Sequence, residues 1–233
     1  MTEPALTRLR HYGRRLGRKL RPGRAALLET LLPKIRIPLA PGTPLDPWAL
    51  FEQRPARLWL EIGFGAGEHA AWQAEHNPDV GLLAAEIFVN GVASLLRHVE
   101  ERGLANVRVH PEDARTLLAA LPEGCLDRVF LLHPDPWPKA RHAERRFVNP
   151  ANLDALARAM ADGAELRIGS DHPVYKVWAL EQMAKRRDFE WLARRAEDWR
   201  IRPADWPETR YEHKAKGEGR SSLYLRYRRA RRP

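Results

Sequence analysis

Cysteine is almost missing from this chain of 233 residues, which has Cys125 and no other. A lone cysteine cannot form an internal disulfide, and no cysteines and histidines have metal-ligand spacing. We therefore expect no metal and a reducing compartment, the cytoplasm. Long apolar runs are also missing: stretches such as LLAAEIF are interrupted by charge. They fall well short of the ~20 residues that a membrane span needs, so we expect no membrane insertion.

Acidic residues are missing from one long stretch near each end of the chain. Residues 4–28 contain eight Arg or Lys and residues 219–233 contain six, and neither stretch has an acid. The remainder has 26 basic and 30 acidic residues, so the ends account for the formal net charge of +10. Such ends are typical of a protein that binds a polyanion, although a solvated surface explains a charge run equally well.

Beyond residue 57, short strand-like segments alternate with segments whose apolar residues recur every three or four positions, as in helices. The expected strands are 57–64, 81–88, 106–110, 126–133, 164–170, 188–195 and 222–229, and the expected helices are 68–77, 92–103, 114–124, 152–163 and 174–187. This alternation predicts an α/β fold with a mostly parallel seven-stranded sheet and helices on both faces. Residues 1–50 are expected to form a basic arm and a helix at 25–34, and residues 51–233 to form the main domain.

A glycine-rich turn, Gly63-Phe64-Gly65-Ala66-Gly67, joins the first expected strand to a helix. Glycines let the backbone turn tightly and approach a ligand closely. Glu68 occupies the position where a dinucleotide-binding fingerprint has Gly or Ala, and its charge competes with a pyrophosphate for the helix N-terminus. With Glu61 just upstream, the turn favours a nucleoside ligand without phosphates.

Two further acids follow the next two expected strands. Glu86 lies 23 residues after Gly63, where a carboxylate accepts hydrogen bonds from both hydroxyls of a ribose. Asp113 is expected near an adenine amine, and a helix N-cap explains it nearly as well. A cationic ligand with ribose, adenine and no phosphate is S-adenosylmethionine. The alternative interpretation makes Glu61 and Glu68 surface acids and Glu86 an ordinary strand-end carboxylate.

A proline-flanked acid follows the fourth expected strand, in HPDPWPKARHAERR at residues 133–146. Pro136 favours an extended conformation at Asp135, and Pro134 removes a backbone donor, so we expect a stiff carboxylate at the mouth of the cofactor pocket. Methyltransferases of exocyclic amines have Asn or Asp followed by Pro-Pro and an aromatic residue, whereas the order here is Pro-Asp-Pro-Trp. Transfer to an adenine or glutamine amine is therefore disfavoured. Trp137 is expected either to stack on an extruded base or to belong to the core.

Several motifs in combination resemble the bacterial tRNA (guanine-N7-)-methyltransferase family. They are RHYGRRLGR, LEIGFGAGEH, PDPWPKARHAERRFV, SDHPVY and TRYEHKAKGEG, and the resemblance extends over nearly the whole chain. It implies a class I, Rossmann-like S-adenosylmethionine-dependent methyltransferase fold. It also implies methyl transfer to N7 of a guanosine in the tRNA variable loop, with no protein partner required. His133 departs from the phenylalanine expected there, which affects local packing.

The resemblance also implies roles for individual residues. The cofactor would be held by the glycine turn (Gly63, Gly65 and Gly67) and by Glu61, Glu86, Asp113 and Asp135, and Asp135 would also be catalytic. The substrate would be bound by Lys139, Asp171, Thr209, Arg210, Tyr211 and Glu212, with Arg141, Arg145 and Arg146 in an RNA-contacting loop.

Elementary chemistry supports a similar assignment. The basic side chains of the 139–146 loop can pair with phosphates, and Asp171 and Glu212 can accept hydrogen bonds from guanine N1–H or its amino group. A helix N-cap is the other explanation for Asp171. Residues 196–220 are expected to be a long irregular segment that orders over the substrate. Guanine N7 already has a free lone pair, so Asp135 would act through alignment and charge.

Three other functions remain open at this stage. A methyltransferase for another base or another RNA would have the same motifs. A non-catalytic RNA-binding module would explain the basic ends but leave Glu86 and Asp135 without a task. A small-molecule methyltransferase would leave the basic ends unexplained.

Overall fold

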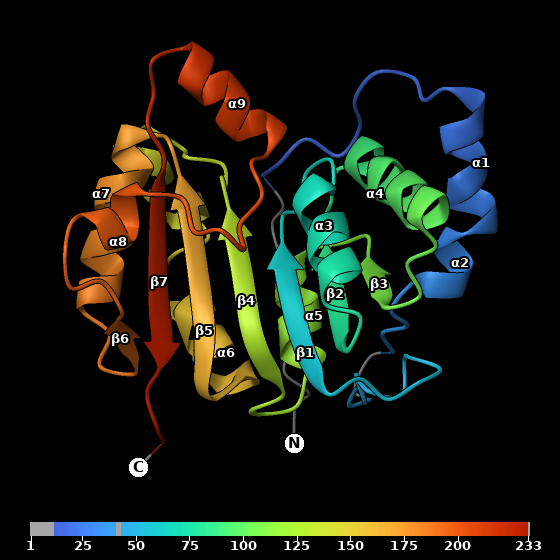
Figure 1. The fold of residues 1–233 in the computed structure, drawn as a ribbon, viewed down its shortest axis with the longest axis horizontal. Helices are drawn as coiled ribbons and strands as arrows, with labels where there is room; N and C mark the ends of the chain where they lie inside the picture. Colours follow the sequence, from blue (N-terminus) through green and yellow to red (C-terminus); the bar gives the residue numbers. More distant parts are fainter. Residues whose placement is uncertain (1–11, 41–42, 233) are drawn as a thin grey trace.

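The computed structural model describes residues 12–40 and 43–232, which form a seven-stranded sheet between two layers of helices (Figure 1). The strand order is β3-β2-β1-β4-β5-β7-β6. The strands are β1 (Arg57–Ile62), β2 (Val80–Ala85), β3 (Val107–His110), β4 (Leu126–Leu132), β5 (Met160–Ser170), β6 (Phe189–Trp191) and β7 (Leu223–Arg229). Strands β1 to β5 pair in parallel, and β7 is antiparallel to both β5 and β6. The predicted mostly parallel α/β sheet is confirmed.

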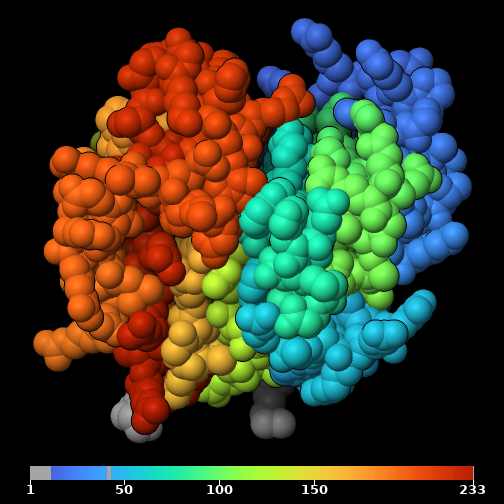
Figure 2. Space-filling model, in the orientation of Figure 1, coloured from blue at the N-terminus to red at the C-terminus, as the bar shows by residue number. Residues whose placement is uncertain are grey.

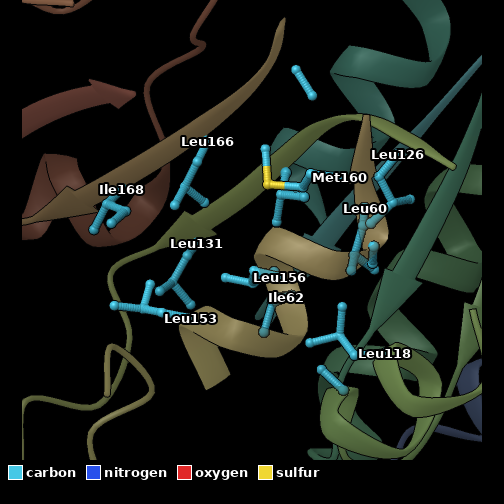
Figure 3. Packing of buried hydrophobic residues seen from close by; sticks show 14 of the residues in the cluster. Leu60, Ile62, Leu118, Leu126, Leu131, Leu153, Leu156, Met160, Leu166 and Ile168 are labelled. Carbon is cyan, nitrogen blue, oxygen red and sulfur yellow. The ribbon is translucent and has the colours of Figure 1, made fainter. Parts of the chain in front are cut away.

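The core has two halves because both faces of the sheet are covered. One face carries α1 (Pro22–Thr30), α2 (Leu32–Ile35), α3 (Glu68–His76) and α4 (Val89–Arg102), and the other carries α5 (Ala114–Ala120), α6 (Pro150–Ala159) and α7 (Pro173–Ala184). Successive residues of a strand point to opposite faces. Leu60 of β1 therefore packs with Leu118 and Leu156 in one half (Figure 3), whereas Trp59 belongs to the other.

The helix N-termini test the N-cap roles suggested for Asp113 and Asp171. Asp113 is the N-cap of α5, where its side chain accepts a hydrogen bond from the Arg115 N–H at 2.8 Å. The N-cap of α7 is His172, whose Nδ1 accepts from the Val174 N–H at 3.2 Å. The N-cap role predicted as the alternative for Asp171 is therefore wrong by one residue.

The sequence suggested that the segment 196–220 is irregular, but part of it is helical. It contains α8 (Glu197–Arg200) and α9 (Arg210–Gly217), and α9 lies above the carboxyl ends of the parallel strands (Figure 1). Trp206, which is 0% exposed, fixes the connection between the two helices. Its ring lies edge-on to Tyr224 of β7, with centroids 5.3 Å apart, and over Gly169 of β5, where a Cβ would be 3.0 Å from the indole.

The described part of the N-terminal arm packs against the domain. Asn90 of α4 accepts from the Gly17 N–H at 2.8 Å and donates to the Arg18 carbonyl at 2.7 Å. Helices α1 and α2 confirm the helix expected at 25–34, and Ile37 is buried in the core. The arm is therefore continuous with the main domain from Tyr12 onward, while residues 4–11 of the basic run lie outside the described residues.

Two arginines of the C-terminal run, Arg229 and Arg232, contact the backbone at the amino ends of the parallel strands, away from α9. Arg229 donates to the Ala157 carbonyl at 2.9 Å. Arg232 donates to the carbonyls of Arg158 at 2.9 Å and Met160 at 2.8 Å, where α6 meets β5. Arg229 and Arg232 thus have partners inside the fold, whereas Arg228 and Arg231 of the same run are exposed. Polyanion binding by this end of the chain stays a prediction.

Candidate active site

A cavity of about 460 Å³ opens at the carboxyl ends of β1, β2 and β4. This is where parallel α/β sheets bind ligands, because the loops that follow the strands converge there. Among the predicted cofactor residues, those that line it are Glu61, Gly63, Gly65, Glu86, Asp113 and Asp135, and three predicted substrate residues, Arg145, Thr209 and Tyr211, also line it. Sequence positions spread over 150 residues thus meet at one cavity.

The glycine turn adopts a backbone that other residues rarely adopt. The φ angles of Gly63, Gly65 and Gly67 are +69°, +58° and +81°, all in the left-handed region. Gly63 and Gly65 line the cavity, whereas Gly67 starts α3 and packs against Leu95, so its role is structural. Gly91 of α4, which no sequence motif indicated, lies so close to the turn that a Cβ there would be 2.2 Å from the Gly65 carbonyl oxygen. Only glycine lets α4 approach the turn this closely.

Glu86 connects the glycine turn to the loop after β2. Its two carboxylate oxygens accept hydrogen bonds from the N–H groups of Gly65 and Phe88, each at 2.9 Å. Burial raises the pKa of Glu86, while these backbone donors partly offset the rise. The carboxylate thus has a fixed position at the cavity wall.

The other acids near the turn differ in burial. Glu61 is buried at the cavity floor, with Oε2 2.8 Å from His69 Nδ1. The interpretation of Glu61 as a surface acid is therefore wrong. Glu68 lies in the first turn of α3, with Oε1 3.7 Å from Arg210 Nε. Asp113 combines its N-cap role with an ion pair to Arg115, at 2.6 Å.

A buried arginine, Arg146, holds the loop that carries Asp135. Arg146, only 4% exposed, donates to the carbonyls of Pro136 at 3.1 Å and Trp137 at 3.0 Å, and its guanidinium lies 4.6 Å from the Trp178 ring centroid. The phosphate contact predicted for Arg146 is therefore wrong, because its donors point into the protein. His133 and Trp137 have φ of +49° and +40°, which non-glycine residues keep only where the surroundings enforce them. Asp135 thus projects from a rigid loop.

The Asp135 carboxylate is accessible, yet it lies in a concave site between loops. Burial by the surrounding walls raises its pKa above the usual range for aspartate. Trp137 also lines the cavity and is half-buried outside the core, so the core interpretation of this residue is wrong. Its ring meets Tyr12 edge-on at 6.1 Å, and the Arg145 guanidinium lies 4.5 Å from the Tyr12 ring. An aromatic and cationic rim therefore flanks Asp135.

The predicted substrate residues fall into an exposed group and an internally paired group. The exposed residues are Lys139, which precedes the 3-10 helix η1 (Ala140–Arg145), Arg141 within it, and Arg210 and Tyr211, the last 61% exposed. Thr209 is the N-cap of α9 and accepts from the Glu212 N–H at 3.3 Å. Glu212 itself is 0% exposed, accepts a hydrogen bond from Tyr224 Oη and lies 3.7 Å from Arg202 Nε.

Asp171 is also engaged within the protein. It forms an ion pair with Arg220, and its Oδ1 lies 3.2 Å from His133 Nδ1. Both carboxylate oxygens of Asp171 are therefore occupied. In Glu212 only Oε1 is engaged, and Oε2 is buried without a hydrogen-bond partner among the described residues. Sequence position indicated that these acids lie near the site but not that Arg220 and Tyr224 pair with them.

Two absences apply to residues 12–40 and 43–232. Within these ranges, no group of three or more His, Cys, Asp or Glu side chains could hold a metal ion. No helix in the same part of the chain is long and apolar enough to cross a membrane.

The sheet order, the glycine turn and the acid-lined cavity define a class I methyltransferase fold. It is shared with the 16S rRNA (adenine(1408)-N(1))-methyltransferase from Catenulisporales acidiphilia, at a TM-score of 0.52 and 19% identity over 82% of this chain and 96% of that one. Residues 55–225 match the family described as "Putative methyltransferase".

Closer relatives identify the family. The tRNA (guanine-N(7)-)-methyltransferase of Rhodospirillum rubrum is 50% identical over 98% of this chain and 91% of its own length. The enzyme of the same name from Zymomonas mobilis is 50% identical over 96% of both chains. The chain belongs to the tRNA (guanine-N(7)-)-methyltransferase family.

Proposed function

We propose that this protein transfers a methyl group from S-adenosylmethionine to N7 of a guanosine in tRNA, in the variable loop. One observation carries the proposal: a cavity lined by Glu61, Glu86 and Asp113 opens beside the rigid carboxylate of Asp135. The names of the relatives, at 50% identity over nearly the whole chain, support N7 of guanine as the target. We place this activity in the cytoplasm, and independence from a protein partner stays a prediction.

The cavity suits S-adenosylmethionine in size and charge. Its volume of about 460 Å³ is in the range of small-molecule sites. Glu86 would hold the ribose hydroxyls, Asp113 the adenine side, and Glu61 with Asp135 the cationic methionyl end. The bound cofactor would supply an electrophilic methyl group on a positively charged sulfur.

Catalysis by this chain follows from the chemistry of guanine N7. The lone pair is already available, so no residue has to remove a proton from the nucleophile. Positive charge develops on the purine ring during transfer, and the fixed negative charge of Asp135 stabilises it. Asp171 and Glu212 would select guanine through its N1–H and amino donors after giving up Arg220 and Tyr224 as partners.

The exposed cations around the cavity supply the tRNA-binding surface in this proposal. Lys139 precedes η1 and Arg141 lies within it. Arg145 of η1 and Arg14 of the N-terminal arm line the cavity. Such side chains pair with phosphates and fix the position of the RNA without reading its sequence. The target guanosine would then enter between Asp135 and Tyr211.

The Glu86→Ala variant is expected to bind S-adenosylmethionine about 10- to 100-fold more weakly than wild type. Charge-assisted hydrogen bonds of this kind contribute roughly 1.5–3 kcal/mol each. Isothermal titration calorimetry measures the effect, with Glu52→Ala, an exposed acid elsewhere, as the matched control. Equal affinities of the two variants for S-adenosylmethionine would show that Glu86 does not bind the cofactor.

The double variant Arg141→Ala/Arg145→Ala is expected to bind tRNA with a weaker salt dependence. Each lost phosphate contact lowers the slope of log affinity against log salt by about one. Binding measured at several salt concentrations gives this slope, and Arg194→Ala/Arg195→Ala, in the connection between β6 and α8, is the control. A slope identical to wild type would show that η1 does not touch phosphate.

Mass spectrometry of nucleosides tests the function itself. Unmodified tRNA incubated with the protein and S-adenosylmethionine is expected to yield N7-methylguanosine. A different methylated base would identify the alternative enzyme. Binding of tRNA without any methyl transfer would favour the non-catalytic RNA-binding alternative.

A further inference from the structure

A chain of buried side chains joins the cavity floor to the backbone of the α8–α9 connection. Glu61 Oε2 lies 2.8 Å from His69 Nδ1, and His69 Nε2 lies 3.2 Å from Gln73 Nε2. Gln73 Nε2 lies 2.7 Å from the carbonyl oxygen of Asp205. We call the side chains of Glu61, His69 and Gln73 the relay. They are 1–2% exposed, so water does not compete for their hydrogen bonds.

The Asp205 carbonyl gives the relay a single hydrogen-bonding direction. A carbonyl can only accept, so the Gln73 amide must present its nitrogen to Asp205. The second hydrogen of that nitrogen then donates to His69 Nε2, which leaves the ring hydrogen on Nδ1 to donate to Glu61. The Gln73 oxygen faces Asn77 Nδ2 at 3.4 Å, in agreement with this orientation.

The relay connects parts of the chain that meet the cavity from different sides. Glu61 lies near the carboxyl end of β1. Asp205 precedes Trp206 and Thr209 in the segment that leads into α9, which contains Tyr211. Helix α3 lies directly beside this segment (Figure 2). The Trp206 ring is 6.4 Å from the ring of His69, edge-on, so the histidine touches both the relay and the anchor of the segment.

We propose that His69 and Gln73 are positioning residues that couple occupancy of the cavity at Glu61 to the placement of residues 205–211. The proposal rests on the function proposed above, in which the cavity takes S-adenosylmethionine and the segment contacts tRNA. A cationic ligand at Glu61 draws the carboxylate toward itself and changes its hydrogen bond to His69. The ring and the Gln73 amide follow, because His69 donates to Glu61 and the Gln73 nitrogen donates to both His69 and the Asp205 carbonyl. The Asp205 carbonyl then moves with them.

Coupling of this kind must be reciprocal, since the effect of one ligand on the other equals the reverse effect. The demethylated product, S-adenosylhomocysteine, is an unreactive probe that reports binding alone. It is expected to change the affinity of wild-type protein for tRNA by about fivefold or more, within the usual range for coupled sites. Gln73→Met keeps the volume of the side chain and removes both donors, and there the change is expected to fall below about twofold.

The matched control is Gln182→Met, the same change at a buried glutamine of α7 on the other face of the sheet. This variant is expected to retain the wild-type coupling. Amide hydrogen exchange provides a second readout that does not depend on any variant. Adding S-adenosylhomocysteine to wild-type protein is expected to slow exchange in residues 205–212, where Trp206 and Thr209 lie.

The outcomes separate this proposal from the function on which it rests. Failure of wild-type protein to bind S-adenosylhomocysteine would overturn the proposed cofactor and the relay together. Normal binding with unchanged exchange at 205–212, or with coupling preserved in Gln73→Met, would overturn the relay alone. Loss of coupling in Gln182→Met as well would show a general packing effect and would equally contradict the proposal.

Discussion

The Asp135→Asn variant is expected to form N7-methylguanosine at least about 10²–10³-fold more slowly than wild type. A preorganised charge at the reacting group typically contributes this much to the rate, and the loop that carries Asp135 is rigid. Arg146 holds the loop through the Pro136 and Trp137 carbonyls. Asparagine preserves the shape of the side chain, so the variant removes the charge alone. Single-turnover methylation at saturating cofactor and tRNA measures the effect.

The pH dependence gives the same prediction a second test. Burial raises the pKa of Asp135, so this carboxylate loses its charge at a higher pH than an ordinary aspartate as the solution is acidified. The wild-type rate is therefore expected to fall on the acid side as the group becomes protonated, and Asp135→Asn is expected to lack that fall. Asp154→Asn, a surface acid of α6, is the control. Wild-type turnover by Asp135→Asn would exclude a catalytic charge at this position.

The Trp206→Ala variant is expected to lose about 3–5 kcal/mol of unfolding free energy, the usual cost of removing a fully buried tryptophan. The indole packs between Gly169, Tyr224 and His69, so its removal leaves a cavity against the sheet. The segment from Asp205 to α9 also loses its anchor, and tRNA methylation is expected to fall with it. Denaturant unfolding measures the first effect and single-turnover methylation the second.

Trp191→Ala provides the matched comparison, because Trp191 of β6 is 44% exposed. The same chemical change there is expected to cost less than about 1 kcal/mol, as substitutions at exposed positions usually do. Equal unfolding free energies for the two variants would mean that Trp206 does not anchor the segment. A destabilised Trp206→Ala variant with unchanged methylation would separate the anchor from the substrate site.

The sequence predicted the sheet well because apolar residues are spaced differently in the two kinds of element. They form short continuous runs in buried parallel strands and recur every three or four positions in amphipathic helices. It also located Asp135 and Glu86, since both follow a strand and ligands bind where parallel strands end. Side-chain direction was harder to predict. Arg145 and Arg146 are adjacent and chemically identical, yet one faces the cavity and the other is buried beneath its loop. A short 3-10 turn has too few residues for the spacing of apolar positions to show which side chains point inward. Charge alone does not show this either.

Residues that act through distant partners were also missed by the sequence analysis. Gly91 permits close contact with the Gly65 carbonyl, and Trp206 fills a space over β5, but each depends on a neighbour far away in the chain. Glu212 belongs to a motif that indicates substrate binding, whereas its buried partner Tyr224 is visible only in the folded protein. Local patterns contain no information about such pairings before the topology is known.

The order of the strands has a consequence for how the protein is made. Among the described strands, β7 is the last to leave the ribosome, yet it lies between β5 and β6. Translation adds residues at about 5–20 per second, so β5 is released well before the neighbour that covers its open edge. Strand β6 pairs with β7 alone among the described strands. The nascent chain therefore exposes an unpaired β5 edge until β7 has emerged, and chaperone binding during that interval would protect it from aggregation.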